Sequence, residues 1–79
     1  MRVTYTLTME AVCPVDKKKD VYEVEVISDR TIPVEDILRL TKDQPEAFQE
    51  TLTENLARLL GAKVISTGHH SGVKTVCEA

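Results

Sequence analysis

Residues 48–61 are FQETLTENLARLLG, and they carry the clearest helix pattern in the 79-residue chain. Apolar side chains recur there at helical spacing and form one stripe, made by Phe48, Leu52, Leu56, Leu59 and Leu60. Gly61 follows the stripe, and glycine readily takes the left-handed conformation that ends a helix. The sequence therefore predicts an amphipathic helix that starts beside Pro45 and ends at Gly61.

The chain after this helix returns to an extended pattern. Residues 62–70 predict a strand, Ser71-Gly72 suits a two-residue hairpin loop, and residues 73–78 predict the returning strand. His69 and His70 are adjacent in the first of these strands, so their side chains point to opposite faces of the sheet. At most one of the two histidines can therefore face a given site.

A hairpin and a short helix are predicted before the long helix. Residues 3–13 alternate between apolar and polar side chains, Pro14 ends that strand, and residues 20–28 alternate again after the charged loop 16–19. The expected apolar faces are Val3, Tyr5, Leu7, Met9, Ala11 and Cys13 in the first strand and Tyr22, Val24 and Val26 in the second. Pro33 suits the first position of a helix that ends near Thr41, with Val34, Ile37 and Leu38 as its apolar stripe.

The predicted order of elements is ββααββ in a single domain spanning residues 1–79. This order indicates an α+β fold, in which two helices cover one face of a four-stranded antiparallel sheet. With three aromatic residues and no Trp, the core is small, and chains of this size are often stabilised by association. Closing several copies into a barrel would also remove the bare edge strands, so we expect a homo-oligomer.

Composition excludes several classes of protein. Thirteen acidic and ten basic residues give a net charge of −3, and no stretch concentrates enough Lys and Arg to neutralise a phosphate backbone. Direct nucleic-acid binding is therefore disfavoured. No apolar run approaches the ~18 residues of a membrane span, and the first residues lack a signal-peptide core, which predicts a cytoplasmic protein. In that compartment Cys13 and Cys77 are expected to be thiols.

Cys13 and Asp20 form the first candidate catalytic pair. A hairpin brings a thiol at the end of one strand close to a carboxyl at the start of the next, which suits covalent and acid–base catalysis. The lysines at positions 17–19 would favour the thiolate if they folded toward it. The alternatives are a small buried thiol in the core and an ordinary acid flanking a loop.

Glu50 is the second candidate, as a substrate-binding residue. At 100° per residue it lies about 200° around the helix from Phe48, so it is expected to be exposed within one subunit. Its carboxylate could accept paired N–H bonds from a flat heterocycle if a neighbouring subunit covered the site. The alternative is an acid that stabilises the helix N-terminus. No zinc-type ligand spacing connects the cysteines and histidines, so no metal site is predicted.

Several of these stretches resemble the tunnelling-fold superfamily. They are the ββααββ order, residues 49–53 at the start of the second helix, and the final hairpin at residues 70–75. The superfamily includes GTP cyclohydrolase I, which has a similar helix motif, 6-pyruvoyl-tetrahydropterin synthase, dihydroneopterin aldolase and the nitrile reductase of queuosine biosynthesis. Cys13-Pro14, followed by Asp20 seven positions after the cysteine, resembles the signature of the nitrile reductase.

The resemblance implies specific roles. Subunits of this superfamily close into barrels with active sites at the subunit junctions, and a glutamate on a helix anchors a purine or pterin ring. Glu50 matches that anchor, and Gln49 and His70 lie in the matching stretches as further substrate-binding residues. In the nitrile reductase the cysteine adds to the nitrile of 7-cyano-7-deazaguanine as a thioimide, the aspartate transfers a proton, and NADPH delivers hydride. Cys13 and Asp20 match these two residues.

The sequence also departs from the nitrile reductase. Residues 16–19 replace its usual Thr-Gly-Gln-Pro, and residues 34–38 stand where it has the Glu-Ser-Lys-Ser stretch that binds NADPH. NADPH is thus a possible cofactor and not an assigned one, and the related archaeal amidinotransferase, which uses the same nitrile in tRNA without NADPH, fits better. Two alternatives remain: a pterin enzyme of the cyclohydrolase, aldolase or synthase type, and a non-catalytic module that binds a purine or pterin or serves as a scaffold.

Overall fold

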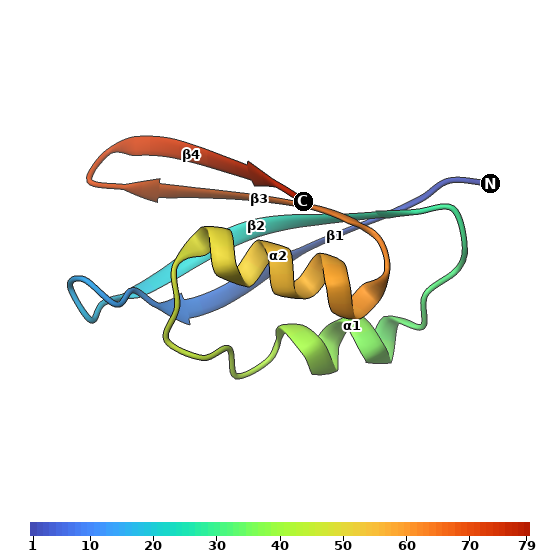
Figure 1. Cartoon of the computed structure of the whole chain (residues 1–79), viewed down its shortest axis with the longest axis horizontal. Helices are drawn as coiled ribbons and strands as arrows, with labels where there is room; N and C mark the ends of the chain where they lie inside the picture. Colours follow the sequence, from blue (N-terminus) through green and yellow to red (C-terminus); the bar gives the residue numbers. More distant parts are fainter.

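The computed structural model describes residues 1–79 and has four strands and two helices in the predicted order (Figure 1). The strands are β1 (Val3–Val12), β2 (Lys19–Ser28), β3 (Lys63–His70) and β4 (Val73–Glu78), and the helices are α1 (Val34–Thr41) and α2 (Gln49–Leu60). The strands form one antiparallel sheet in the order β1-β2-β3-β4. Both helices cover the same face of this sheet, which confirms the α+β class.

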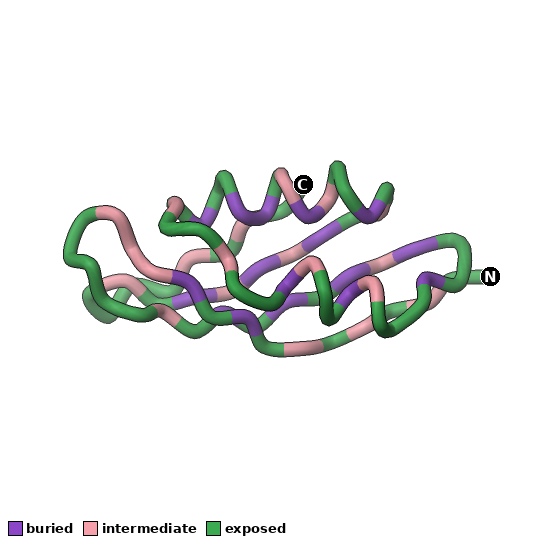
Figure 2. Tube along the Cα trace, turned by 90° about the horizontal axis from the view of Figure 1, so that it is seen from below, coloured by how far each residue is buried: buried purple, intermediate pink, exposed green.

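The faces predicted for the first hairpin are confirmed. Val3 pairs with Ser28 and Val12 with Lys19, so the alternating apolar positions of both strands lie on the side that carries the helices. Figure 2 shows the buried positions of α2 turned toward those of the strands. The core cluster consists of Met9, Ala11, Tyr22, Val24, Val26, Ile32, Ile37, Leu52, Leu56, Leu60 and Val64.

The first strand ends one residue earlier than predicted, at Val12. The Cys13 N–H donates to the Lys18 carbonyl (2.9 Å), and the Lys17 N–H donates back to the Cys13 carbonyl (2.9 Å). Lys17 closes this loop with a left-handed φ of 62°. Cys13 therefore opens the loop between β1 and β2 and does not continue the ladder.

The predicted helix stripes were wrong at several positions. Phe48 and Leu59 are exposed, as are Val34 and Leu38 of the first helix. Helix α2 starts at Gln49 and not beside Pro45, because Phe48 has an extended backbone. Its buried side is made by Gln49, Leu52, Thr53, Leu56 and Leu60, and that of α1 by Ile37 and Thr41. Hydrogen bonds to neighbouring polar groups allow Gln49 and Thr53 to be buried, and apolarity alone could not reveal this.

The predicted ends of the second helix and the second hairpin are confirmed. Gly61 has a left-handed φ of 60°, and Ser71 and Gly72 have φ values of 53° and 83°. Two successive left-handed residues form the tight turn whose twist matches that of the flanking strands. Neither helix is long and apolar enough to cross a membrane.

Three connecting segments gather at one end of the molecule. They are the β1–β2 loop, the first turn of α2 and the β3–β4 turn, which lie together on the left of Figure 1. The strand order leaves β1 and β4 as the two edges of the sheet. The fold thus places the chemically interesting segments at one end and its unpaired strand edges along the two sides.

Candidate active site

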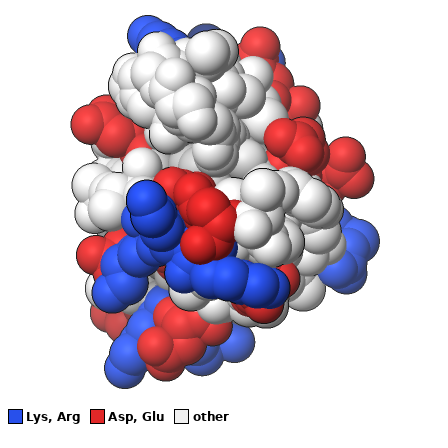
Figure 3. All heavy atoms as spheres, turned by 90° about the vertical axis from the view of Figure 1, so that its left-hand side faces the viewer, with Lys and Arg blue, Asp and Glu red and all other residues white.

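A pocket of about 350 Å³ opens where these three segments meet. This volume lies in the range that holds small heterocyclic ligands. All five residues selected from the sequence line it: Cys13, Asp20, Gln49, Glu50 and His70. Figure 3 looks onto this end of the molecule, where uncharged surface lies above a group of mixed basic and acidic side chains.

Cys13 is half-buried at the wall of this pocket, directly before Pro14. It is not a member of the hydrophobic core, so the alternative of a sealed core thiol is wrong. The second thiol, Cys77, lies outside this pocket on β4. Burial raises the pKa of the Cys77 thiol, and the charge of Glu50 raises it further.

The lysine run does not fold toward the thiol. Lys17 forms an ion pair with Glu46, and Lys19 forms one with Glu10 (3.3 Å). Asp16 lies close to the thiol instead. Its carboxylate accepts the Lys18 N–H (3.0 Å), and this hydrogen bond lowers the pKa of Asp16, with a smaller contribution from the Cys13 side chain. An ionised acid, and not an ammonium group, is therefore the neighbour of Cys13.

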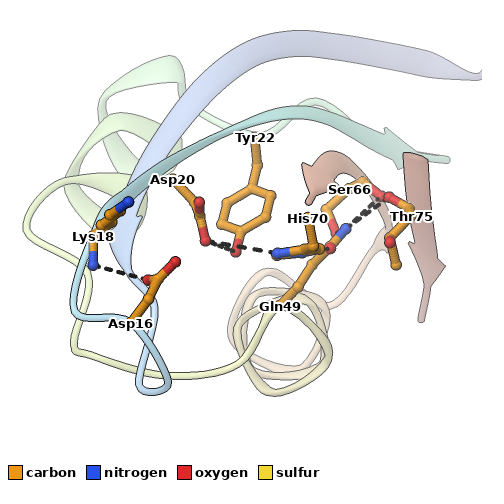
Figure 4. A network of polar contacts seen from close by, with 8 residues as sticks. All are labelled: Asp16, Lys18, Asp20, Tyr22, Gln49, Ser66, His70 and Thr75. Carbon is orange, nitrogen blue, oxygen red and sulfur yellow. Dashed lines mark hydrogen bonds and ion pairs between the residues drawn. The ribbon is translucent and has the colours of Figure 1, made fainter. Parts of the chain in front are cut away.

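Asp20 is half-buried and contacts two aromatic side chains (Figure 4). The Tyr22 hydroxyl donates to Asp20 Oδ2 (3.4 Å), and His70 Nδ1 lies 3.8 Å from the same oxygen. Burial raises the pKa of Tyr22 to about 12, and the Asp20 charge adds to the effect. The phenol therefore stays protonated at neutral pH and can keep donating to Asp20.

Gln49 is 2% exposed, and its side-chain amide is bonded within the chain. The amide nitrogen donates to the Ser66 carbonyl, the Ser66 hydroxyl and the Thr75 carbonyl, and its oxygen lies 2.9 Å from His70 Nε2. A direct contact of Gln49 with substrate stays a prediction. Its amide has a structural role in this pocket.

Glu50 is exposed on the first turn of α2, as predicted from its angle around the helix. It also borders a smaller hollow between α2 and β4, next to Cys77. His70 points to the helix side of the sheet, where Tyr22 lies (ring centroids 6.1 Å apart), while His69 is exposed. Both histidines line the pocket, so the expectation that at most one of them faces the site was wrong. Glu50 is exposed, like Asp16, and is thus open to a ligand or a neighbouring chain.

The residues that line the pocket do not fit the binding of a metal ion or of NADPH. No three His, Cys, Asp or Glu side chains are grouped so that they could hold a metal ion. No Lys or Arg lines the pocket of a single chain, although the phosphates of NADPH call for such partners. We therefore derive no hydride step for this pocket.

Sequence reasoning missed three side chains that shape the pocket. Tyr22 was assigned only to the core, Asp16 only to a solvated loop, and Phe48 only to the apolar stripe, yet all three line the pocket. The pairing of Met9 with Tyr22 places the phenol two residues past Asp20 on the same face, so the period-2 rule could have revealed it. No comparable pattern in the sequence predicts the loop geometry that brings Asp16 beside Cys13.

The raised pKa of Tyr22 predicts a loss of stability in alkaline solution. An unfolded tyrosine ionises near pH 10 and the folded Tyr22 near 12, so the stability due to its protonated form is complete below pH 10 and is lost as pH rises toward 12. Urea unfolding followed from pH 8 to 12 should show this decline in the wild type. It should be shallower in Tyr22→Phe and retained in the control Tyr5→Phe. Equal slopes in all three proteins would contradict the assignment.

Comparison with known proteins identifies the fold. No family model and no curated protein matches the sequence. Among solved structures, the crystal structure of the archaeosine synthase QueF-Like in its apo form is similar, with a TM-score of 0.83 and 22% sequence identity. The alignment covers 99% of this chain and 90% of that chain. The chain therefore has the tunnelling fold that its sequence motifs predicted.

Proposed function

We propose that this chain is an enzyme that acts on the nitrile of a 7-deazapurine through a covalent thioimide at Cys13. The observation that carries the proposal is the meeting of Cys13, Asp20 and Glu50 at one pocket of ligand size, although they come from separate elements. The similarity to a protein named archaeosine synthase supports the substrate class, because archaeosine is a 7-deazapurine nucleoside.

Recognition of the heterocycle is assigned to the first turn of α2. The Glu50 carboxylate is exposed and can accept two N–H bonds from the edge of a guanine-like ring. Phe48 and Val15 expose apolar surface at the same pocket, 51% and 78% of their full areas. A flat ring needs such surface for its faces, so the pocket offers both a polar anchor and an apolar support.

The covalent step uses Cys13 and Asp20. The sulfur of Cys13, as thiolate, attacks the nitrile carbon, a C–S bond forms, and one π bond of the C≡N group opens. Asp20 takes the proton of the Cys13 thiol and passes it to the nitrile nitrogen, which gives a neutral thioimide and returns Asp20 to its carboxylate form. The Tyr22 hydroxyl remains bonded to that carboxylate and stabilises its charge.

The thioimide is then a substrate for an amine. Attack by ammonia or a primary amine at the same carbon breaks the C–S bond, returns a proton from the amine to the Cys13 sulfur as thiol, and gives an amidine without any change in oxidation state. We favour this amidinotransferase-like outcome over reduction because the pocket of a single chain has no cationic partner for the phosphates of NADPH.

A neighbouring copy of the chain is part of the proposal. The strands β1 and β4 are unpaired edges, and Glu50 lies exposed on the side of α2 that borders β4. Pairing β1 of one copy with β4 of the next would cover these edges and roof the pocket. The proposed enzyme is therefore a closed ring with sites at its subunit junctions.

Intact-mass measurement tests the function. After incubation with 7-cyano-7-deazaguanine, the wild-type mass should rise by the mass of one ligand per chain. Cys13→Ala should give no adduct, and the matched control Cys77→Ala should retain it, because burial and the Glu50 charge keep Cys77 in its thiol form.

Two results would contradict the proposal. Ligand that binds without any adduct would favour the non-catalytic binding module, and an adduct that persists in Cys13→Ala would assign the chemistry to another residue. Light scattering on the same samples tests the ring, since a monomer at all concentrations would exclude a site completed by a second copy.

A further inference from the structure

The hydrogen bonds around Gln49 have only one consistent direction. The Ser66 and Thr75 carbonyls can only accept, so the Gln49 atom that lies 3.2 and 3.1 Å from them must be the amide nitrogen. The Thr53 hydroxyl donates to the Gln49 carbonyl (2.7 Å), so the Ser66 hydroxyl must donate to Thr53 (2.6 Å) and accept from Gln49 (3.1 Å). This leaves the Gln49 side-chain oxygen as a fixed, buried acceptor.

The fixed acceptor determines where His70 carries its proton. His70 Nε2 lies 2.9 Å from Gln49 Oε1, and an amide oxygen cannot donate, so Nε2 must carry a hydrogen. The other ring nitrogen, Nδ1, is then the only one that can gain or lose a proton while this contact lasts. Nδ1 faces Asp20 Oδ2 at 3.8 Å (Figure 4).

The groups around His70 come from several elements of the fold. The β1–β2 loop contributes the Cys13 thiol and the Asp16 carboxylate, and α2 contributes the Glu50 carboxylate. Strand β2 contributes Asp20 and the protonated Tyr22, and β3 contributes His69, which is exposed and lines the same pocket, whereas its pairing neighbour Lys74 lies outside it. The pocket is thus lined by three carboxylates and by no Lys or Arg, and of the three only Asp20 lies within 4 Å of a His70 ring nitrogen.

We propose that His70 is a positioning residue for the Asp20 carboxyl, which its Nδ1 faces, and that Gln49 holds the imidazole in this orientation through Nε2. The proposal rests on the proposed function for the role of Asp20 as proton donor. In the thioimide step Asp20 takes the proton of the Cys13 thiol as the sulfur attacks and passes it to the nitrile nitrogen, while His70 holds the carboxyl in place. No proton or electron is left unaccounted for.

Nitrogen-15 NMR of the full chain without ligand tests the orientation of the His70 ring independently of any reaction. Nε2 of His70 should remain protonated at every pH, and only Nδ1 should titrate. In Gln49→Leu, which removes the acceptor, the hydrogen should no longer be confined to Nε2. A wild type whose neutral ring carries the hydrogen on Nδ1, or a Gln49→Leu variant in which the hydrogen stays confined to Nε2, would overturn the proposal.

The reaction supplies a second readout. His70→Gln should slow adduct formation with 7-cyano-7-deazaguanine about tenfold and shift its pH profile, while the ligand concentration for half-saturation stays unchanged. The control is Lys74→Gln on β4, an exposed residue outside the pocket, which should behave as the wild type. An unchanged pH profile in His70→Gln would overturn the role of His70. A wild type that forms no adduct would instead refute the proposed function, and the NMR titration would still show which ring nitrogen of His70 carries the hydrogen.

Discussion

Asp20→Asn is expected to slow thioimide formation by about 10²–10⁴-fold and to leave ligand affinity nearly unchanged. The amide keeps the shape of the carboxyl and can still accept the Tyr22 hydroxyl, but it cannot deliver a proton to the nitrile nitrogen. The rate of mass increase with 7-cyano-7-deazaguanine measures the chemical step, and calorimetric titration in a Cys13→Ala background measures binding alone. This separation matters because Asp20 belongs to the pocket wall as well as to the proposed chemistry.

Asp16→Asn is the matched control for this substitution. Asp16 lies in the same pocket, but the hydrogen bond from the Lys18 N–H lowers its pKa, so its carboxylate takes up a proton less readily than an ordinary aspartate. Removing its charge also removes a carboxylate that opposes a second negative charge on Cys13. We therefore expect Asp16→Asn to form the adduct at least as fast as the wild type, and to react faster with iodoacetamide at Cys13.

A comparison of the two aspartate variants shows which acid transfers the proton. A large loss of rate in Asp16→Asn with little change in Asp20→Asn would show that the loop acid, and not the strand acid, transfers the proton. Equal losses in both would indicate a general effect of charge on ligand binding, which the calorimetric affinities would reveal. The assignment of Asp20 survives only if its loss is the larger one and appears in rate and not in affinity.

The order of elements and the sheet were predictable because they rest on local patterns. The alternation of Tyr22, Val24 and Val26, the left-handed stop at Gly61 and the Ser71-Gly72 loop are all properties of a few neighbouring residues. The buried side of α2 was not predictable in this way. This buried side includes the polar residue Gln49, whose burial depends on hydrogen bonds to Ser66 and Thr75 in strands distant along the chain.

The candidate site was predictable to a similar degree. A hairpin necessarily brings Cys13 and Asp20 to one neighbourhood, and the helix angle of Glu50 placed it away from the core. Whether the lysine run folds toward the thiol was left open, and the structure shows Lys17 and Lys19 paired with Glu46 and Glu10, because long, flexible side chains find partners through tertiary contacts. No sequence pattern distinguishes such a choice beforehand.

Stability and site geometry depend on the same side chains. Tyr22 is 2% exposed and belongs to the core, yet its hydroxyl bonds Asp20. Its ring lies against Gly68 of β3, where a Cβ would come within 2.5 Å of Tyr22 Cδ1 and 2.6 Å of Cε1. The close approach of these two strands therefore fixes the ring that supports the proposed proton donor.

Gly68→Ala is expected to lower the free energy of unfolding by roughly 2–3 kcal/mol, which is typical of overpacking in a well-filled core. The added methyl group can be accommodated only if the Tyr22 ring moves, because the atoms it would meet belong to a buried ring and not to a flexible chain end. Urea unfolding measures the loss. The displaced ring should also withdraw its hydroxyl from Asp20, so adduct formation should slow under conditions where the variant is still folded.

Gly72→Ala is the matched control, because it adds the same methyl group in the turn four residues later. A Cβ there meets nothing within 4 Å, and only the left-handed φ of 83° opposes it. The expected cost is about 1 kcal/mol, without a change in the rate of adduct formation. If Gly68→Ala cost no more than Gly72→Ala, the Tyr22 ring would be free to move, and its hydroxyl could not be what holds Asp20 in position. A larger loss at Gly68 together with a slower reaction would show that strand packing beneath the pocket determines the geometry of the site.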